Sequence, residues 1–520
     1  MIDLAVRNGV VVDGTGAQER SADVGIDDGR VVAVGEVPAA EREIDADGKV
    51  VAPGFIDIHS HSDFTLLVDP RAASAIHQGV TLEVVGNCGF GCFPLLNKEL
   101  APKAIYGHSA DVPLTWTSAA GYFERLEEAR PAINVASLAP NGQIRLSVVG
   151  LADRPARPDE LDRMRYLLDE TLEQGAFGYS TGLEYAAERG ADEDELVSMC
   201  EVCGAHHGVY ATHTRRRDDG ADEAVAEALR TAERAGVRLQ VSHLVPRNGA
   251  ESSRRCIELV EDSAASGMDV AFDMHTRLYG TTFLLTALPA WAVEDPERLE
   301  EILGSDEQRR KMREYESILS AGGDWSRIVL LDNDVWPIYA RRDIASIADE
   351  RGQDPLDAVY DLLLGAAAAP GKLMVIIHAY TEEQQREAFG HPLCVPGSDA
   401  TTLSPDGPLA GRVFHGAYTW AAWYVRFCVR DERILSLPEA IHRLTGAPAA
   451  RLGVTGRGVL QAGAHADLAI FDPLAFREEG TTFDPSRLAT GMDTVIVNGT
   501  VTLSGGESTG ARNGQVLRRS

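Results

Sequence analysis

The sequence is poor in cysteine, in basic residues and in long apolar runs. Seven cysteines among 520 residues are too sparse, and odd in number, for a disulfide framework. Lys and Arg total 49 against 79 Asp and Glu, and the resulting charge of −30 disfavours nucleic acid and anionic membrane surfaces as partners. The apolar run from Leu362 to Ile377 is interrupted by Pro370, Gly371 and Lys372, so no membrane span is predicted. No secretion signal is evident at the N-terminus, and we expect a cytoplasmic location.

The remaining composition is that of a large globular protein of the α/β class. Hydrophobic residues make up 44% and charged residues 25% of the chain, the usual balance for a folded domain. Fifty glycines against 6% aromatic residues indicate many tight turns between short elements. The length allows one large domain and a smaller companion.

Both ends of the chain carry strand signatures. Asn8-Gly9 and Asp28-Gly29 each stand between extended runs, a pattern typical of β-hairpins, and Asn498-Gly499 repeats it near the C-terminus. Neither end has enough strands to bury a face by itself. We therefore predict one small β-sandwich built jointly from residues 1–53 and 453–520.

Between these ends, short apolar runs alternate with charged, helix-like stretches. This repetition over residues 54–452 predicts a (β/α)8 barrel. Glu- and Arg-rich helical sequence from about 281 to 345 interrupts the spacing and indicates an insertion. The expected strands exceed by one the eight of a closed barrel, so one of them must be peripheral. They lie near 54–58, 80–86, 132–138, 176–180, 208–212, 238–242, 269–274, 374–378 and 393–397.

Several expected strands end in side chains that can bind a metal ion. His59 and His61 follow the first barrel strand, and because alternate side chains of a strand point the same way, both can reach one ion. Other strand ends carry His213, His243 and Asp399. Each alone is best explained as a buried histidine or a helix-capping aspartate. Together they favour a zinc site, because the C-terminal strand ends form the active-site face of a barrel.

Such a site predicts hydrolysis of an amide bond. Catalytic zinc keeps one coordination position for water, lowers the pKa of that water and polarises a carbonyl group. Asp399 would accept the proton of the water and pass it to the leaving nitrogen, as a general base and acid.

At these residues the sequence resembles the amidohydrolase superfamily and, more narrowly, the N-acyl-D-amino-acid deacylases (D-aminoacylases). The likeness covers nearly the whole chain, and it implies a metal-dependent barrel with a flanking β-sandwich that hydrolyses a linear N-acyl bond. The motifs that carry it are His59-Ser60-His61, Gln78-Gly79-Val80-Thr81, Gly86-Asn87-Cys88-Gly89-Phe90, the run from Gly178 to Tyr185, Thr212-His213-Thr214-Arg215, Val241-Ser242-His243 and Gly397-Ser398-Asp399.

The resemblance also implies a ligand set. In that family the cysteine after Gly-Asn is a metal ligand, and here it is Cys88, whose thiolate would bind zinc strongly. By this carry-over one tightly bound zinc has the ligands Cys88, His213 and His243. A second site, weakly occupied or empty, has the ligands His59, His61 and Asp399.

Departures from the family pattern concern the substrate. Deacylases of this kind usually carry a lysine after Ser-His-Leu, where this chain has Val245, and a His-Pro-Arg triplet where it has Gly411-Arg412-Val413. In the family those cations hold the substrate carboxylate. We therefore expect a small-molecule amide other than a simple N-acyl-D-amino acid. Residues expected to contact the substrate are Tyr185, Arg215, His275 and Arg412.

Two alternatives stay open at this point. A cyclic amide or imide hydrolase of the hydantoinase or dihydroorotase type shares the barrel and the metals, but it generally uses a carboxylated lysine where this chain has Cys88. A catalytically silent barrel, kept for binding or assembly, is disfavoured by the full set of ligand types. The sequence is also compatible with a homo-oligomer.

Overall fold

The computed structural model describes residues 1–293, 298–317, 319–320 and 322–519. The chain forms two compact units. The first consists of Met1–Thr276, Glu383–Gly480 and the residues from Asp484 onward, and the second of Arg277–Glu382 and Thr481–Phe483. All metal-ligand and substrate-contact residues predicted above belong to the first unit.

Eight parallel strand positions form a closed barrel in the first unit. The strands pair in two runs, β6-β7-β8 and β9-β10-β11-β12-β13-β17. β8 and β9 are successive pieces of one strand position and join the runs on one side, while Ser60 pairs with Ala400 on the other. The predicted barrel is confirmed. Its strands are β6 (Phe55–Asp57), β7 (Val80–Val85), β8 (Asn134–Ser137), β9 (Ala139–Pro140), β10 (Gly178–Gly182), β11 (Val209–His213), β12 (Arg238–Val241), β13 (Val270–His275) and β17 (Cys394–Gly397).

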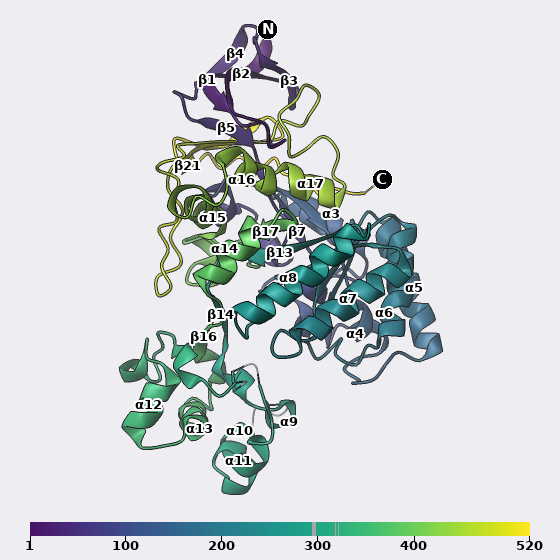
Figure 1. Ribbon diagram of the computed structural model, residues 1–520, viewed down its shortest axis with the longest axis vertical. Coiled ribbons are helices and arrows are strands. Elements are labelled where there is room, and N and C mark those ends of the chain that lie inside the picture. The colour runs from purple at the N-terminus through teal and green to yellow at the C-terminus, as the bar shows by residue number, and fades with distance from the viewer. Residues whose placement is uncertain (294–297, 318, 321, 520) are drawn as a thin grey trace. The chain divides into compact units, whose positions relative to one another are not determined.

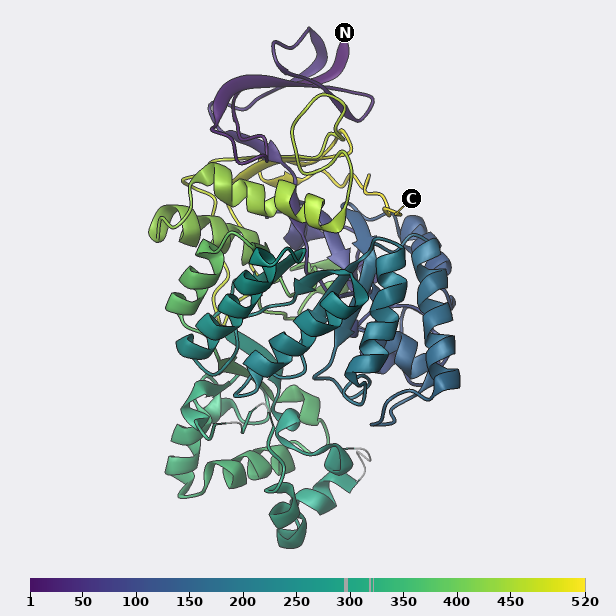
Figure 2. The ribbon, with the colours of Figure 1, turned by 45° about the vertical axis from the view of Figure 1, so that its right-hand side comes forward.

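Helices surround these strands and bury their apolar faces against them. The successive helices α5 to α8 lie side by side in Figures 1 and 2, as expected for a barrel in which each strand is followed by a helix. α7 ends at Gly236 with a φ of +64°, a left-handed cap that glycine adopts readily. The helices of this unit are α1 (Thr65–Val68), α2 (Ala73–Ile76), α3 (Ala119–Ala129), α4 (Asn141–Val148), α5 (Pro158–Glu173), α6 (Glu193–Ala205), α7 (Ala221–Ala235), α8 (Ala250–Ala265), α14 (Glu382–Gly390), α15 (Trp420–Val425), α16 (Leu437–Leu444) and α17 (Gly446–Leu452).

The peripheral strand is the one predicted at 374–378. It forms β16 (Met374–His378), which lies in the second unit and pairs antiparallel with β14 (Tyr279–Phe283) and β15 (Ile328–Leu330). The insertion predicted at 281–345 falls within the same unit. The described helices of this unit are α9 (Ala290–Val293), α10 (Leu299–Leu303), α11 (Asp306–Met312), α12 (Ile344–Arg351) and α13 (Pro355–Gly365).

Strands from both chain ends form one sheet. β5 from the N-terminal part pairs antiparallel with β18 from the C-terminal part, and both ends contribute to one apolar core. The sheet order is β21-β20-β19-β18-β5-β1-β2-β3, with β4 beside β1. The bounds are β1 (Ile2–Val11), β2 (Arg20–Asp27), β3 (Arg30–Gly35), β4 (Ala40–Asp45), β5 (Val50–Pro53), β18 (Leu468–Phe471), β19 (Met492–Val497), β20 (Thr500–Ser504) and β21 (Glu507–Ser508).

The prediction of a hairpin is wrong at one of the three expected positions. Asp28-Gly29 and Asn498-Gly499 do connect paired strands, β2 to β3 and β19 to β20. The chain passes through Asn8-Gly9 without reversing, however, and the register of β1 against β2 shifts there. Asn8 has a φ of +57°, so this dipeptide forms a β-bulge inside one long strand.

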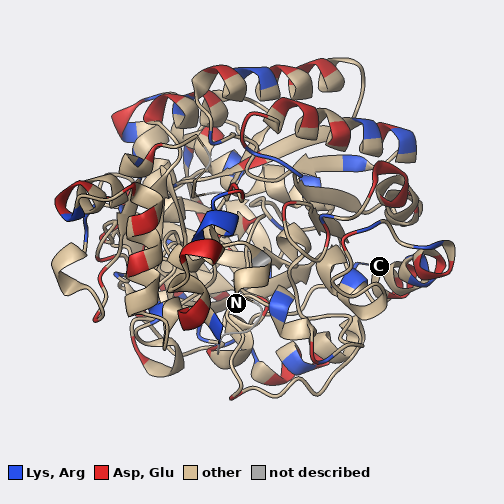
Figure 3. Ribbon diagram, turned by 90° about the horizontal axis from the view of Figure 1, so that it is seen from below, with Lys and Arg blue, Asp and Glu red and all other residues tan. Residues whose placement is uncertain are grey.

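No helix among the residues that the structure describes is long and apolar enough to cross a membrane. Acidic and basic residues are interspersed along the helices in Figure 3. Ion pairs such as Arg230–Glu193 and Arg234–Asp194 join neighbouring helices.

Candidate metal centre

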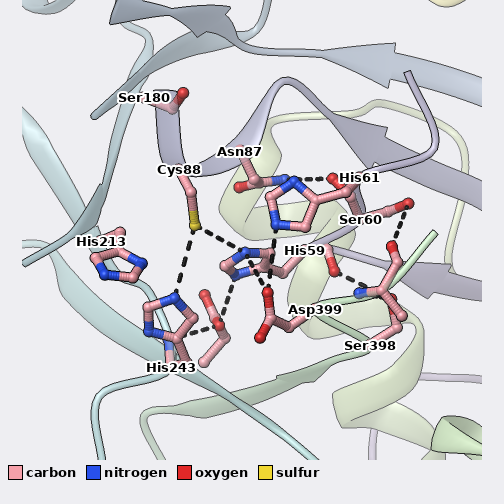
Figure 4. A network of polar contacts seen from close by, with 12 residues as sticks. His59, Ser60, His61, Asn87, Cys88, Ser180, His213, His243, Ser398 and Asp399 are labelled. Atoms are coloured by element: carbon pink, nitrogen blue, oxygen red, sulfur yellow. Dashed lines mark hydrogen bonds and ion pairs between the residues drawn. The ribbon is translucent and has the colours of Figure 1, made fainter. Parts of the chain in front are cut away.

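Cys88 lies on a tight turn directly after β7, and two side chains hold that turn in place. The Asn87 side-chain amide donates to a β7 carbonyl at 2.8 Å. The Ser180 hydroxyl donates to the Gly86 carbonyl and accepts from the Gly89 N–H at 3.1 Å. Cys88 itself has a φ of +53°. These contacts place its sulfur among the histidines in Figure 4.

We expect Gly89→Ala to disturb this turn more than an ordinary glycine substitution would. Gly89 has a φ of +71°, and a Cβ there would overlap with the buried Glu188 carboxylate. Overpacking of this kind costs about 1–3 kcal/mol, in addition to the backbone strain. The variant should unfold at lower urea concentration and retain less metal.

Gly463→Ala is the matched control. Gly463 has a φ of +92° but nothing within 4 Å of an added Cβ, so its substitution isolates the backbone strain. If the two variants unfold at the same urea concentration and retain the same metal, close packing beneath Cys88 is not needed.

The ligand atoms form two overlapping groups. His59, Cys88 and His243 present their atoms within 4.8 Å of one another, and so do His59, His61 and Asp399. Cys88 Sγ lies 3.2 Å from His59 Nε2 and 3.6 Å from His243 Nε2. Asp399 Oδ1 lies 3.5 Å from His59 Nε2 and 3.3 Å from His61 Nε2. His59 thus belongs to both groups and joins them (Figure 4).

These separations match those of a zinc coordination shell. With Zn–N near 2.0 Å and Zn–S near 2.3 Å, tetrahedral geometry places a sulfur and a nitrogen ligand about 3.5 Å apart, and a nitrogen and an oxygen ligand about 3.4 Å apart. The measured distances lie close to both values. The donor set also fits, because thiolate, imidazole and carboxylate are the usual ligands of zinc.

Burial shapes the electrostatics of the site. Burial raises the pKa of the Cys88 thiol to about 11, even though His59 opposes this shift. Burial also lowers the pKa of His59, but Asp273 and Cys88 outweigh it and hold that pKa well above its usual range. The pKa of His243 is held well below its usual range by burial and by Arg217. A cation among these groups would favour the thiolate of Cys88.

His213 lies beside this cluster but turns its nitrogens elsewhere. Its ring centroid is 4.5 Å from that of His243. Its Nε2 lies 2.8 Å from a Glu184 carboxylate oxygen and its Nδ1 lies 3.3 Å from the Tyr185 hydroxyl. Burial lowers the pKa of His213 to about 4. The role of His213 as a ligand therefore stays a prediction that requires its ring to exchange Glu184 for the ion.

Three residues of the cluster have an unusual backbone conformation. Cys88, His243 and Asp399 have φ angles of +53°, +35° and +45°. Non-glycine residues adopt this region rarely, at a cost of about 1–3 kcal/mol each, and such residues concentrate at functional sites. The fold therefore holds three of the expected ligands in strained turns at the ends of their strands.

The predicted substrate contacts have different surroundings. Tyr185 lies at the site, with its ring 4.7 Å from that of His213. Arg215 forms an ion pair with Glu227 at 2.8 Å. Arg412 donates to the Gly107 carbonyl at 3.0 Å. His275 is buried at the end of β13. Contact of these four residues with a substrate stays a prediction.

Sequence analysis missed two residues that organise the site. Glu184 joins His213 to Arg247, whose guanidinium binds both carboxylate oxygens at 2.9 and 3.0 Å. Asp273 accepts a hydrogen bond from His59 at 2.9 Å. A signal for Asp273 was present, because it lies two residues before His275 and alternate residues of a strand share a face.

The closed parallel barrel and its strand-end ligand groups are typical of metal-dependent barrel hydrolases, and comparison with known proteins shows the family to which the chain belongs. The model of the amidohydrolase family matches residues 42–311 and 340–503, and the chain belongs to this family. It is 32% identical to the N-acyl-D-glutamate deacylase of Alcaligenes xylosoxydans xylosoxydans, over 100% of this chain and 97% of that one.

Solved structures show the same relationship. A crystal structure of N-acyl-D-glutamate deacylase from Bordetella bronchiseptica, complexed with zinc and a phosphonate inhibitor, matches with a TM-score of 0.80 at 30% identity, and all of both chains is covered. A D-hydantoinase structure matches with a TM-score of 0.59 at 17% identity, over 100% of this chain and 99% of that one. The hydantoinase shares the fold and is the more distant of the two.

Proposed function

We propose that this protein is a zinc-dependent amidohydrolase that cleaves a linear N-acyl amide bond of a small molecule. The observation that carries the proposal is the pair of ligand groups around His59, whose separations suit a zinc shell. In the ligand set proposed for the first ion, His213 takes the place that His59 has in the observed group. The N-acyl-D-glutamate deacylases matched above supply the reaction class. The ligands we propose are Cys88, His213 and His243 for one ion, and His59, His61 and Asp399 for a second.

The residues of the chain divide the work in this proposal. Zinc, when bound, polarises a carbonyl group and lowers the pKa of a water molecule. We assign the proton transfer to Asp399. Its side chain is 21% exposed while that of His61 is 3% exposed, so the Asp399 carboxylate is the one that a substrate can reach. Its carboxylate can accept the proton of the attacking water and deliver it to the leaving nitrogen. Tyr185, beside His213, can donate a hydrogen bond to the substrate.

A hydrolysis screen of the zinc-loaded protein tests this proposal. It should contain N-acyl amino acids of both hands, amides without a carboxylate, and cyclic imides. We expect turnover of linear amides that disappears when zinc is removed by a chelator and returns when zinc is added. Faster turnover of cyclic imides would favour the hydantoinase alternative. Bound zinc without any hydrolysis would favour the silent barrel.

The substrate that we propose is an amide whose carboxylate is absent, masked or held in another way. Val245 is fully buried where the family has a lysine. Arg247, two residues further, is neutralised by Glu184. Half-buried aromatic rings lie close to the ligands instead. The ring of Tyr106 stacks on that of His61 with their centroids 4.6 Å apart, and the ring centroids of Phe90 and Tyr106 are 4.8 Å apart. These rings favour an apolar group next to the amide.

We therefore expect slow hydrolysis of simple N-acetyl-D-amino acids, and a gain with Val245→Lys. A cation at this position would pair with the substrate carboxylate, so kcat/KM for free-acid substrates should rise. Val245→Met is the matched control, since it lengthens the side chain without adding charge. A kcat/KM above roughly 10⁴ M⁻¹s⁻¹ on these substrates for the unmodified protein would contradict the expectation. Arg412 would then be the first residue to replace by alanine, with a rise in KM expected.

Location and organisation complete the proposal. All seven cysteines are free and buried, which supports a reducing compartment such as the cytoplasm. We also propose that the chain is divided into a barrel at residues 54–452 and a β-domain formed by residues 1–53 and 453–520. It is supported by the pairing of β5 with β18, which joins the two chain ends.

A further inference from the structure

Asp273 contacts both halves of the candidate metal centre. It lies on β13 and is 2% exposed. One carboxylate oxygen, Oδ1, accepts from His59 Nδ1 at 2.9 Å and from the His243 backbone N–H at 2.8 Å. The other, Oδ2, accepts from the Gln240 side-chain amide at 3.2 Å. These neighbours lie on or directly after other barrel strands: His59 follows β6, Gln240 lies on β12 and His243 follows it.

The contact with His59 determines which ring nitrogen carries the proton. A carboxylate can only accept, so Asp273 holds a proton on Nδ1 of His59. In the neutral imidazole that metal binding requires, the lone pair then lies on Nε2. Nε2 is the atom that lies 3.2 Å from Cys88 Sγ and 3.5 Å from Asp399 Oδ1. Asp273 therefore directs the lone pair of His59 toward the space that both ligand groups share.

The contact with His243 supports a strained turn. His243 has a φ of +35°, which an isolated chain would leave readily. Asp273 binds its N–H, and Arg217 donates to its carbonyl at 2.7 Å. The peptide groups on both sides of the residue are thus held, and the imidazole faces Cys88.

We propose that Asp273 is the positioning residue of the metal centre: one buried carboxylate fixes the tautomer of His59 and the turn of His243, and so sets the zinc affinity of both ligand groups. The inference rests on the zinc site of the proposed function. It assigns Asp273 a role through its neighbours, without contact with the substrate. Hydrogen-bond partners of this kind typically change metal affinity by 10–100-fold.

Asp273→Asn tests the proposal, because asparagine keeps the shape but not the charge. The neutral amide cannot form the charge-assisted bond to His59, and its NH2 replaces one of the two oxygens that accept from His59, His243 and Gln240. We expect a zinc dissociation constant raised 10–100-fold in competition with a chelator. Co²⁺ substitution gives an independent readout, since the thiolate charge-transfer band reports the ion held by Cys88 and His243 and should shift when the turn of His243 is released.

Asp467→Asn is the matched control. Asp467 is also a buried carboxylate with three donors: Arg457, the Asn498 N–H at 2.7 Å and the Asn134 amide at 3.3 Å. It lies outside both ligand groups, so its variant should lower thermal stability and leave zinc affinity unchanged. The proposal is overturned if the zinc dissociation constant of Asp273→Asn is within twofold of that of the parent protein, or is no higher than that of Asp467→Asn.

A second variant keeps the test informative if Asp273→Asn does not fold. Gln240→Leu removes only the donor to Oδ2, so Asp273 keeps its bonds to His59 and His243 but is held less firmly. We expect a loss of zinc affinity smaller than that of Asp273→Asn, at the lower end of or below the roughly 10–100-fold typical of such partners. Unchanged affinity in this variant overturns the proposal. Because these readouts need no substrate, a protein whose zinc affinity depends on Asp273 but that hydrolyses no amide would contradict only the proposed function.

Discussion

Replacing Cys88 by alanine should remove the bound zinc and abolish hydrolysis. Cys88 is the thiolate of the site, and its sulfur lies within 3.6 Å of two imidazole nitrogens. Loss of a direct ligand should weaken zinc binding by more than the roughly 100-fold attributed to outer partners. The measurement is zinc content by emission spectroscopy after dialysis, followed by turnover on the best substrate of the screen.

Cys92→Ala is the control for this variant. Cys92 is fully buried four residues later and belongs to neither ligand group found among the described residues. Its replacement leaves a small cavity, so thermal stability should fall while zinc and turnover stay. If Cys88→Ala kept full zinc content and full turnover, the proposed site would be wrong.

The histidines separate the two ligand sets. We expect His213→Ala and His243→Ala to lose zinc as Cys88→Ala does, and His59→Ala to reduce activity with a smaller loss of metal. This expectation requires His213 to leave Glu184, from which its Nε2 is 2.8 Å away. The reverse order, with His59→Ala the more damaging, would make His59 the third ligand beside Cys88, as it lies in Figure 4.

Asp399→Asn should reduce kcat by about 10²–10⁴-fold while zinc content and folding stay nearly unchanged. The size of the effect is that of removing a general acid–base group. Folding should persist because asparagine tolerates a positive φ, and Asp399 has one of +45°. The Asp399 backbone N–H donates to the His59 carbonyl, a bond that the substitution leaves in place.

Kinetics and metal analysis on the same preparation check this result. Asp406→Asn serves as the control, because Asp406 is 74% exposed and pairs with Arg71 outside the ligand groups. Near-normal turnover in Asp399→Asn would assign the proton transfer to another residue, with His275 the next to replace. A large loss of zinc would instead make the Asp399 carboxylate necessary for metal retention.

Much of this protein follows from local sequence pattern. Short apolar runs predict the barrel strands, and the ligands stand directly after them, because strand ends and turns are determined by neighbouring residues. Cys88 is recognisable only through its Gly-Asn-Cys-Gly context and the family resemblance. The turn signatures at Asp28-Gly29 and Asn498-Gly499 likewise act over a few residues.

Tertiary structure alone decided the rest. The strand at 374–378 has the same local pattern as the barrel strands, yet it pairs outside the barrel, because pairing depends on distant partners. Asn8-Gly9 became a bulge because β2 pairs with β1 on both sides of it. The bond from His59 to Asp273 spans 214 residues, and the turn of His213 toward Glu184 depends on a neighbouring strand. Such contacts are determined by the packing of the whole barrel, which periodicity in one segment does not encode.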